Sequence, residues 1–390
     1  MVTDIGLFFE PVNSVSSESF NEGSIGRSIN KYEEGKGFPE LTKGSVAIFG
    51  VTENRRSDSN QSVAEDLGAI RKQFYQLQNH FGSLQLFDLG NIAAGQTVED
   101  TYYAVTNSVA AVIKKGGIAV ILGGGQDLTC ANYLAYEQLE QVVNLVSVDS
   151  RFDLGGADDD VSSTSYLQKV IVHQPNILFN YSNVGFQTHH VKPSEVDLLK
   201  KMYFDTYRLG EVQADLSHVE PVIRNADLVS FDVTSIRSAD YPSNYRSEPN
   251  GLYGEQACAI ARYAGISDKT TSIGFYECHC DAGNDRRSAT LIAQLIWYFV
   301  WGVCSRKGDY PFAEKEEYTK FTVALKDGKY DVVFYKSARS DRWWMEVPYP
   351  TTRGQKYERH FMVPCNYDDY LKACEDEVPD RWWETYQKLG

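Results

Sequence analysis

The chain has little positive charge for its size. Its 390 residues include 38 Lys and Arg against 53 Asp and Glu, which gives a formal net charge of −15. Phosphate backbones and anionic lipid surfaces attract clustered basic side chains. The composition therefore argues against a nucleic-acid partner and against binding to an anionic membrane.

Cysteine is also scarce. Seven cysteines, an odd number, are scattered through the chain, which is poor material for a disulfide framework. We therefore expect reduced thiols and a cytoplasmic location. The first residues contain no basic segment followed by an apolar run, so no secretory signal is predicted.

Long hydrophobic runs are absent as well. The most apolar stretch, residues 291–304, is about 14 residues long and contains Gln294. It is shorter than the ~20 residues that a membrane-spanning helix needs. We predict a buried helix there and no membrane insertion.

What the chain does contain is a regular alternation of short apolar runs and amphipathic segments over residues 45–305. Residues 45–51 form a continuous apolar run, as in a strand buried on both faces, and residues 64–81 carry apolar side chains at helical spacing. A further helix is predicted over residues 212–224. This alternation predicts an α/β domain of three layers, α/β/α, around a mainly parallel sheet. Residues 1–44 are predicted to be an N-terminal extension that packs on it.

The character changes in the last part of the chain, residues 306–390. Two β-rich runs, residues 321–325 and 330–335, flank Asp327-Gly328, which is a hairpin signal. We predict a small aromatic-rich extension with a β-hairpin and a short helix. The sequence Asp-Arg-Trp-Trp occurs twice and includes Trp343, Trp344, Trp382 and Trp383. These aromatic side chains either cover the main domain or form a partner-binding patch, since Trp and Arg are typical interface anchors.

Three motifs at predicted strand ends carry the candidate chemistry. They are Gly123-Gly124-Gly125-Gln126-Asp127, then Asp149-Ser150-Arg151-Phe152-Asp153, and then Ser230-Phe231-Asp232-Val233-Thr234. The carboxyl ends of parallel strands meet at one edge of a sheet, so Asp149, Asp153 and Asp232 are expected to converge. Converging carboxylates repel each other unless a cation or a proton offsets their charge.

Together these motifs resemble the ureohydrolase superfamily, which holds arginase, agmatinase and formimidoylglutamase. The family pattern reads Gly-Gly-Asp-His-Ser, Asp-Ala-His-x-Asp and Ser-x-Asp-x-Asp. Gly274-Phe275-Tyr276-Glu277 is similar to the family strand that ends in a substrate-contacting Glu. The resemblance implies two Mn²⁺ ions, a bridging hydroxide that attacks an amidine carbon, and assembly into a homo-oligomer.

Half of the family's metal ligands are replaced in this chain. By the resemblance, Gln126 and Arg151 stand where the family has His, and Thr234 stands where it has Asp. A guanidinium is always protonated and cannot bind a metal. We therefore interpret Arg151 and Thr234 as metal-replacing residues and expect no two-metal centre to form. Arg151 is expected to pair with Asp149 and Asp232. Either no metal or one divalent ion, Mn²⁺ by resemblance, is expected on Gln126, Asp149, Asp153 and Asp232.

The catalytic positions are altered too. Glu277 keeps the family residue, whereas Asp160 aligns with the catalytic His of formimidoylglutamases. A soft-metal site at Cys278-His279-Cys280 is disfavoured, because neighbouring residues on a strand point to opposite faces. Asp127 is interpreted as the N-cap of the helix that begins near Leu128.

Two functions follow from these residues. The first is a degenerate, formimidoylglutamase-like pseudoenzyme that has lost dimanganese hydrolysis and serves as a binding, scaffold or regulatory protein, with a protein partner or a second copy of itself. The second is a metal-dependent hydrolase of a linear amidine, of formimidoylglutamate or guanidino type, that uses a single metal-bound hydroxide. A small-molecule amidine is a partner only in the second case.

Overall fold

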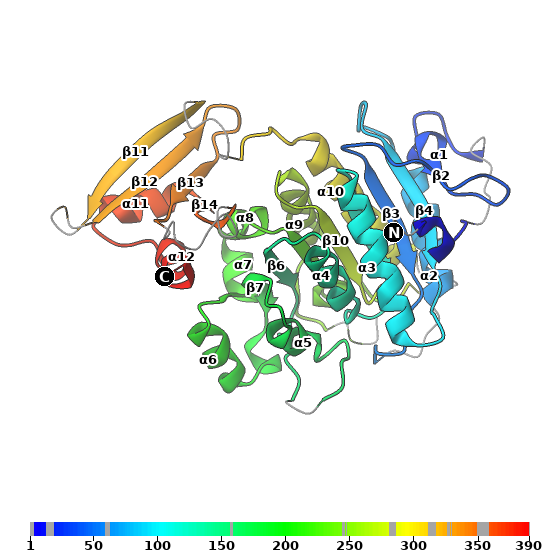
Figure 1. Cartoon of the computed structure of the whole chain (residues 1–390), viewed down its shortest axis with the longest axis horizontal. Coiled ribbons are helices and arrows are strands. Elements are labelled where there is room, and N and C mark those ends of the chain that lie inside the picture. The colour runs from blue at the N-terminus through cyan, green and yellow to red at the C-terminus, as the bar shows by residue number, and fades with distance from the viewer. Residues whose placement is uncertain are drawn as a thin grey trace.

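The structure is a computed structural model of the whole chain. It describes residues 4–12, 19–58, 63–156, 159–243, 246, 248–280, 286–310, 317–325, 328, 330–348 and 359–389. Figure 1 shows a large domain with a smaller layer of strands and helices at its side.

The large domain is built around a ten-stranded sheet with the order β1-β4-β3-β5-β10-β9-β6-β7-β8, and β2 pairs with β4. Every pairing is parallel except that of β1 with β4. The strands are β1 (Phe9–Glu10), β2 (Asn30–Lys31), β3 (Val46–Val51), β4 (Leu86–Ile92), β5 (Ile118–Gly123), β6 (Val143–Val148), β7 (Leu178–Phe186), β8 (Asp205–Arg208), β9 (Leu228–Asp232) and β10 (Ser272–Tyr276). The expected mainly parallel sheet is confirmed.

Helices cover both faces of this sheet. The α-helices of the domain are α1 (Ile25–Ser28), α2 (Val63–Gln76), α3 (Val98–Lys114), α4 (Leu128–Glu137), α5 (Tyr166–Val172), α6 (Pro193–Lys201), α7 (Leu209–Ala214), α8 (Glu220–Arg224), α9 (Gly254–Ile266) and α10 (Arg286–Cys304). Short 3-10 helices occur at Ile5–Phe8, Thr188–His190, Leu216–Val219 and Val233–Ser235.

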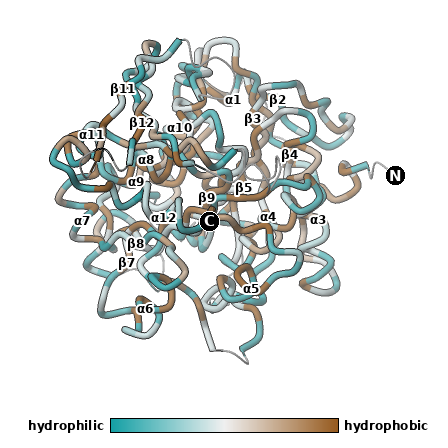
Figure 2. The backbone as a smooth tube through the Cα atoms, turned by 60° about the vertical axis from the view of Figure 1, so that its left-hand side comes forward, coloured by the Kyte–Doolittle hydropathy of each residue, from teal (hydrophilic) through white to brown (hydrophobic). Residues whose placement is uncertain are grey.

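Alternate side chains of one strand face the helical layers on opposite sides of the sheet. In β3, Val46 and Ile48 pack with α2, α9 and α10, whereas Ala47 and Phe49 pack with α3 and α4. Because successive strand residues point to opposite faces, a strand buried on both faces must be apolar throughout. This explains the continuous apolar runs and confirms the three layers. Figure 2 shows the central strands in a predominantly hydrophobic interior.

The predicted buried helix over residues 291–304 lies within α10, whose inner side chains pack under the sheet. No helix within the described part of the chain is long and apolar enough to cross a membrane. The N-terminal segment joins the main sheet, because β1 and β2 both pair with β4.

The C-terminal extension forms a second sheet of four antiparallel strands in the order β11-β12-β13-β14. Its elements are β11 (Tyr318–Leu325), β12 (Tyr330–Ser337), β13 (Trp343–Glu346), β14 (Met362–Cys365), α11 (Tyr367–Cys374) and α12 (Asp380–Leu389). The predicted hairpin corresponds to β11 and β12, while Asp327 of its turn lies outside the described residues. Two helices follow, where one was expected.

Three of the four tryptophans of the repeated motif are core residues of this extension. Trp343, Trp344 and Trp382 are buried, whereas Trp383 is 49% exposed. A buried side chain cannot present a binding surface, which corrects the expected partner patch for the first three. Trp383 alone keeps that prediction open.

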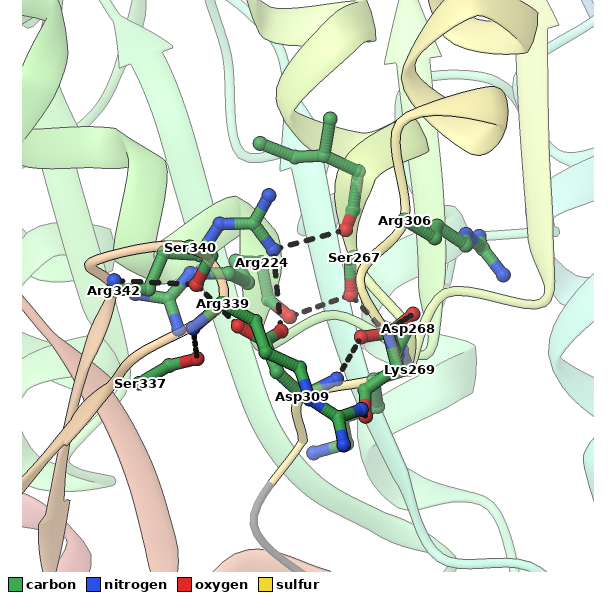
Figure 3. Close-up of polar contacts among 12 residues, drawn as sticks. Arg224, Ser267, Asp268, Lys269, Arg306, Asp309, Ser337, Arg339, Ser340 and Arg342 are labelled. Atoms are coloured by element: carbon green, nitrogen blue, oxygen red, sulfur yellow. Dashed lines mark hydrogen bonds and ion pairs between the residues drawn. The ribbon is translucent and has the colours of Figure 1, made fainter. Parts of the chain in front are cut away.

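The extension is held on the main domain through Arg224 and its neighbours (Figure 3). Arg224 donates from Nη2 to the carbonyls of Trp343 (3.3 Å) and Cys365 (3.2 Å), and its guanidinium carbon lies 4.6 Å from the ring centre of Trp344. Arg342 donates in the opposite direction, to the carbonyl of Ile266 at 3.3 Å. A buried arginine of α8 and a half-buried arginine of the extension therefore join α8 and α9 to the extension.

Candidate active site at the carboxyl edge of the sheet

Four neighbouring strands bring the three motifs and Glu277 together. The strands are neighbours in the order β5-β10-β9-β6. Gln126, Glu277 and Asp149 follow the carboxyl ends of β5, β10 and β6, and Asp232 is the last residue of β9; all four are buried. Gly124, just after β5, is needed for the close approach of the chain that follows β3, because a Cβ there would lie 1.6 Å from the carbonyl oxygen of Glu53. On the side of β10, the Gly124 carbonyl accepts the Glu277 N–H at 2.9 Å.

Asp149 and Asp153 form a buried carboxyl pair. The Asp149 Oδ1 accepts the Arg151 backbone N–H at 2.8 Å, and Asp153 is held at a φ of 51°. Burial raises the pKa of both carboxyl groups, and the nearby charge of Asp149 raises the pKa of Asp153 further. The Oδ2 atoms of the pair accept no hydrogen bond from any other described residue.

Asp232 lies at the end of β9 beside this pair. Its Oδ1 accepts the Thr234 backbone N–H at 2.7 Å, so Thr234 contributes its amide to the site. Burial, with the nearby charge of Asp149 as the second cause, raises the pKa of Asp232 to about 8. Val148 pairs with Phe231 in the sheet, so Asp149 and Asp232 lie at adjacent strand ends, with Asp153 close enough for their charges to raise its pKa. The three aspartates thus converge as expected.

Gln126 is fully buried next to them. Its Nε2 donates to Tyr166 Oη (3.3 Å) and Ser230 Oγ (3.4 Å), and its Oε1 has no hydrogen-bond partner among the described residues. An amide oxygen and two carboxylate oxygens without donors, Gln126 Oε1 and the Oδ2 atoms of Asp149 and Asp153, are therefore buried at one end of the sheet.

Glu277 is enclosed by donors of its own chain. Its Oε1 accepts from Ser163 Oγ (2.6 Å) and from the Gln126 N–H (3.1 Å), and its Oε2 accepts from Ser57 Oγ (2.7 Å). The His279 Nε2 lies 3.8 Å from Oε2. Burial on its own would raise the pKa of Glu277, but His279, Arg246 and the two serines outweigh it and the pKa is lowered.

Arg246, together with His279, supplies positive charge at this edge. The Arg246 charge opposes the rise in the pKa of the three aspartates and contributes to the lowered pKa of Glu277, and its Nη1 lies 3.7 Å from Asp58 Oδ2. Arg151 forms no ion pair with Asp149 or Asp232 in the described structure; it offers Asp149 its backbone N–H. The expected pairing of Arg151 is corrected accordingly, and its metal-replacing role stays a prediction.

Asp160 lies apart from the carboxylates. It is exposed, its backbone carbonyl accepts from Ser165 Oγ at 2.7 Å, and it lines a separate cavity of about 370 Å³ with Arg56, Tyr102 and Lys169. Asp127 is the N-cap residue of α4, as expected, but its side chain makes no capping hydrogen bond. The side chain instead accepts from Tyr102 Oη at 2.5 Å, and burial raises its pKa to about 6.

His279 is a buried histidine that lies between two carboxylates, which favour its protonated form. It lies between Asp66 (3.6 Å) and Glu277 (3.8 Å), and although burial opposes it, these two carboxylates raise its pKa to about 9. Burial raises the pKa of the flanking thiols of Cys278 and Cys280. Protonated thiols and a protonated imidazole are poor metal ligands; that no soft metal binds here stays a prediction.

The donors present do not fit two divalent ions. No group of three or more His, Cys, Asp and Glu side chains in the described ranges is arranged to hold a metal ion. The nearby unpaired oxygens of Gln126, Asp149 and Asp153 are hard donors of the kind that suit Mg²⁺, Ca²⁺ or Mn²⁺. They fit at most one such ion.

Comparison with known proteins decides the family. Residues 45–302 match the arginase family. The chain belongs to this family. Among curated relatives, the formimidoylglutamase of Staphylococcus aureus (strain MRSA252) is 26% identical over 275 residues, covering 66% of this chain and 86% of the relative. The enzyme of strain Newman is 26% identical over 271 residues, covering 65% and 85%.

Solved structures of arginase-family proteins share the fold. Trypanosoma cruzi formiminoglutamase with Mn²⁺ superposes with a TM-score of 0.61 at 20% identity, covering 67% of this chain and 94% of the other. Bacillus subtilis formimidoylglutamase gives 0.61 at 16% identity, covering 72% and 97%, and Bacillus subtilis arginase gives 0.56 at 14%, covering 66% and 98%. This arginase-family chain is thus formimidoylglutamase-like, as the motifs indicated, and its second sheet lies outside the matched range.

Two site residues gave no signal in the sequence. Ser57 and Arg246 come from loops far from the three motifs, and only the path of those loops brings them to the strand ends. Their residue types are common in any loop, so no spacing rule identifies them. Ser163 lies in the segment that resembles the family's catalytic loop, but its bond to Glu277 was not expected.

Proposed function

We propose that this arginase-family protein has lost dimanganese hydrolysis and acts as a binding or regulatory protein. The observation that carries the proposal is the enclosure of Glu277. By resemblance, this residue contacts the substrate in active relatives. Here both carboxylate oxygens already accept hydrogen bonds, from the Ser57 and Ser163 hydroxyls and the Gln126 backbone N–H. A substrate amidine would therefore have to displace donors of the protein itself.

The charge balance supports the same proposal. The negative charges of the three aspartates and Glu277 are offset in part by the positive charge of Arg246. They are also reduced by the raised pKa of Asp232, which favours its protonated form. The raised pKa values of all three aspartates mean that burial is relieved partly by protonation. Gln126, Arg151 and Thr234 stand where a second ion would need two imidazoles and a carboxylate, and a guanidinium cannot supply a lone pair.

A second candidate function is a single-metal hydrolase of a linear amidine. The unpaired oxygens of Gln126, Asp149 and Asp153 favour it, and with Asp232 they would hold one divalent ion. Such an ion would supply Lewis-acid activation of a water. Glu277 would orient the amidine only after releasing at least one serine hydroxyl.

The test is restoration of the family ligands. The triple variant Gln126→His, Arg151→His, Thr234→Asp and the unchanged protein are assayed for formimidoylglutamate and guanidino-compound hydrolysis with Mn²⁺. An inactive parent supports the first candidate, and activity gained in the triple variant supports the ligand assignment. Metal-dependent hydrolysis by the parent would contradict the first candidate.

The second candidate has its own control. Hydrolysis by the parent that is lost in Asp232→Asn but kept in Asp197→Asn, a change of the same charge at an exposed position on α6, would establish it. Equal loss in both variants would show that the activity does not come from the sheet-edge site.

We further propose a cytoplasmic location and self-association. All seven cysteines are free, which agrees with a reducing compartment. Light scattering of the purified protein tests the second point: a mass near 44.0 kDa would identify a monomer and contradict it.

A further inference from the structure

A groove of about 1000 Å³ runs along the surface between α9, α10 and the loop that follows β9. Its charged lining residues are Arg237, Arg262, Arg286, Arg287, Asp240 and Glu255. Arginines outnumber carboxylates there by four to two, although the whole chain carries a net charge of −15. The groove therefore concentrates positive charge in an acidic protein.

Two of these arginines are held in place by aromatic rings. The Arg237 guanidinium carbon lies 4.1 Å from the ring centre of Tyr253, and Arg237 donates to both oxygens of Asp240, at 2.8 and 3.2 Å. The Arg262 guanidinium carbon lies 4.6 Å from the ring centre of Trp301. A guanidinium fixed by stacking loses less freedom when it binds an anion.

Arg262 also has an unused donor. Its Nε is buried and has no hydrogen-bond partner among the described residues. Arg286 and Arg287 begin α10 and are exposed at the same groove. Tyr253, Leu291 and Tyr298 add apolar surface to the lining, so the groove can accommodate the carbon skeleton of an organic anion beside its charged groups.

We propose that this groove is a binding site for a small polyanion that carries at least two carboxylate or phosphate groups. The planar guanidinium donates two parallel hydrogen bonds to either group, and several arginines around one groove select for multiple charge. None of the residues that line the groove is Gln126, Asp149, Asp153, Asp232 or Glu277. Its test measures binding alone, so it does not depend on whether the protein hydrolyses an amidine.

The experiment is calorimetric titration of the full chain with tripolyphosphate and, in a second arm, with citrate. The variant is the double change Arg286→Gln, Arg287→Gln, which alters two exposed side chains. The matched control is Arg27→Gln, Arg208→Gln, which removes the same charge at exposed positions outside the groove. Circular dichroism establishes that each variant is folded.

We expect saturable binding to the parent and the control, and at least about tenfold weaker binding to the groove variant, because each arginine contributes charge-assisted hydrogen bonds. Arg262→Lys keeps the charge and removes the planar fork, so it is also expected to weaken binding. If only one of the two probes binds, its anionic group, phosphate or carboxylate, is the group that the groove recognises. Absence of saturable binding by both probes, or equal weakening in the groove variant and the control, would overturn the proposal.

Discussion

Removal of the Ser163 hydroxyl tests the enclosure of Glu277. Ser163 is fully buried, donates to Glu277 Oε1 at 2.6 Å and accepts the Gln126 N–H at 3.0 Å. In Ser163→Ala the Gln126 N–H keeps its bond to Glu277 at 3.1 Å, so the main loss is one hydrogen bond to a buried charged group. Such a bond contributes roughly 1.5–3 kcal/mol, and we expect the free energy of unfolding to fall by about 2 kcal/mol.

The effect should depend on pH. The pKa of Glu277 is lowered in the folded protein, so its stabilising interactions are present above the pKa of an unfolded Glu and are lost as pH falls through the folded value. Because Ser163 is one of the causes of that lowering, the difference between parent and Ser163→Ala should be largest near pH 7 and shrink towards pH 4.

The assay is urea unfolding at several pH values, with Ser162→Ala as control. Ser162 is half-buried and bonds to the neighbouring hydroxyls of its own loop, so its loss should cost less than about 1 kcal/mol. If Ser163→Ala unfolds within about 0.5 kcal/mol of the parent at pH 7, or if the difference grows as pH falls, Glu277 is not held as described.

Three further predictions concern the framework of the molecule. Trp344 is 1% exposed, so Trp344→Ala should destabilise the protein by roughly 3–5 kcal/mol, whereas Trp383→Ala should change the free energy of unfolding by less than about 1 kcal/mol. Denaturant titration of both variants measures these changes, and equal destabilisation by the two would contradict the burial of Trp344. Arg224→Met leaves one carbonyl of β13 and one of β14 without their donor, so it should lower the free energy of unfolding by roughly 2–4 kcal/mol. Limited proteolysis should release the extension faster than in the parent, and unchanged proteolysis would show that other contacts hold the extension. Gly265→Ala places a Cβ 2.1 Å from the carbonyl oxygen of Phe299, so it should lower thermal stability by the equivalent of about 1–3 kcal/mol, and an unchanged melting temperature would mean that α9 and α10 separate easily.

The sheet could be predicted because its cause is local. A central strand buried on both faces has to be apolar throughout, and residues 45–51 satisfy this condition, as β3 shows. β8 (Asp205–Arg208) was not predicted, because it is a short, polar strand at the edge of the sheet, and edge strands carry no such apolar requirement.

The helix predicted over residues 212–224 is interrupted for a local reason. Asp215 ends α7 and its side chain accepts the Ser217 N–H at 2.8 Å. A short polar side chain that bonds to the nearby backbone competes with the helical ladder. The chain then passes through a 3-10 turn before α8 begins at Glu220, with Pro221 in its first turn.

The candidate site was predictable where it depends on strand ends. Asp149, Asp153 and Asp232 follow directly from the parallel topology and lie together. The cation that acts on them was not predictable. Arg151 is close in sequence and Arg246 is far away, yet it is the charge of Arg246 that opposes the rise in the pKa of the aspartates. Charge pairing between loops depends on their three-dimensional course, which residue spacing does not encode.

The most direct test of the account is the metal content of each chain, measured by elemental analysis on protein purified without chelator from manganese-supplemented cells. We predict at most one tightly bound divalent ion per chain. No ion is expected if Arg246 and protonation neutralise the aspartates. One ion is expected if Gln126, Asp149, Asp153 and Asp232 form a single metal site. Two Mn²⁺ ions per chain would contradict the account, because the residues present offer no ligand set for the second ion.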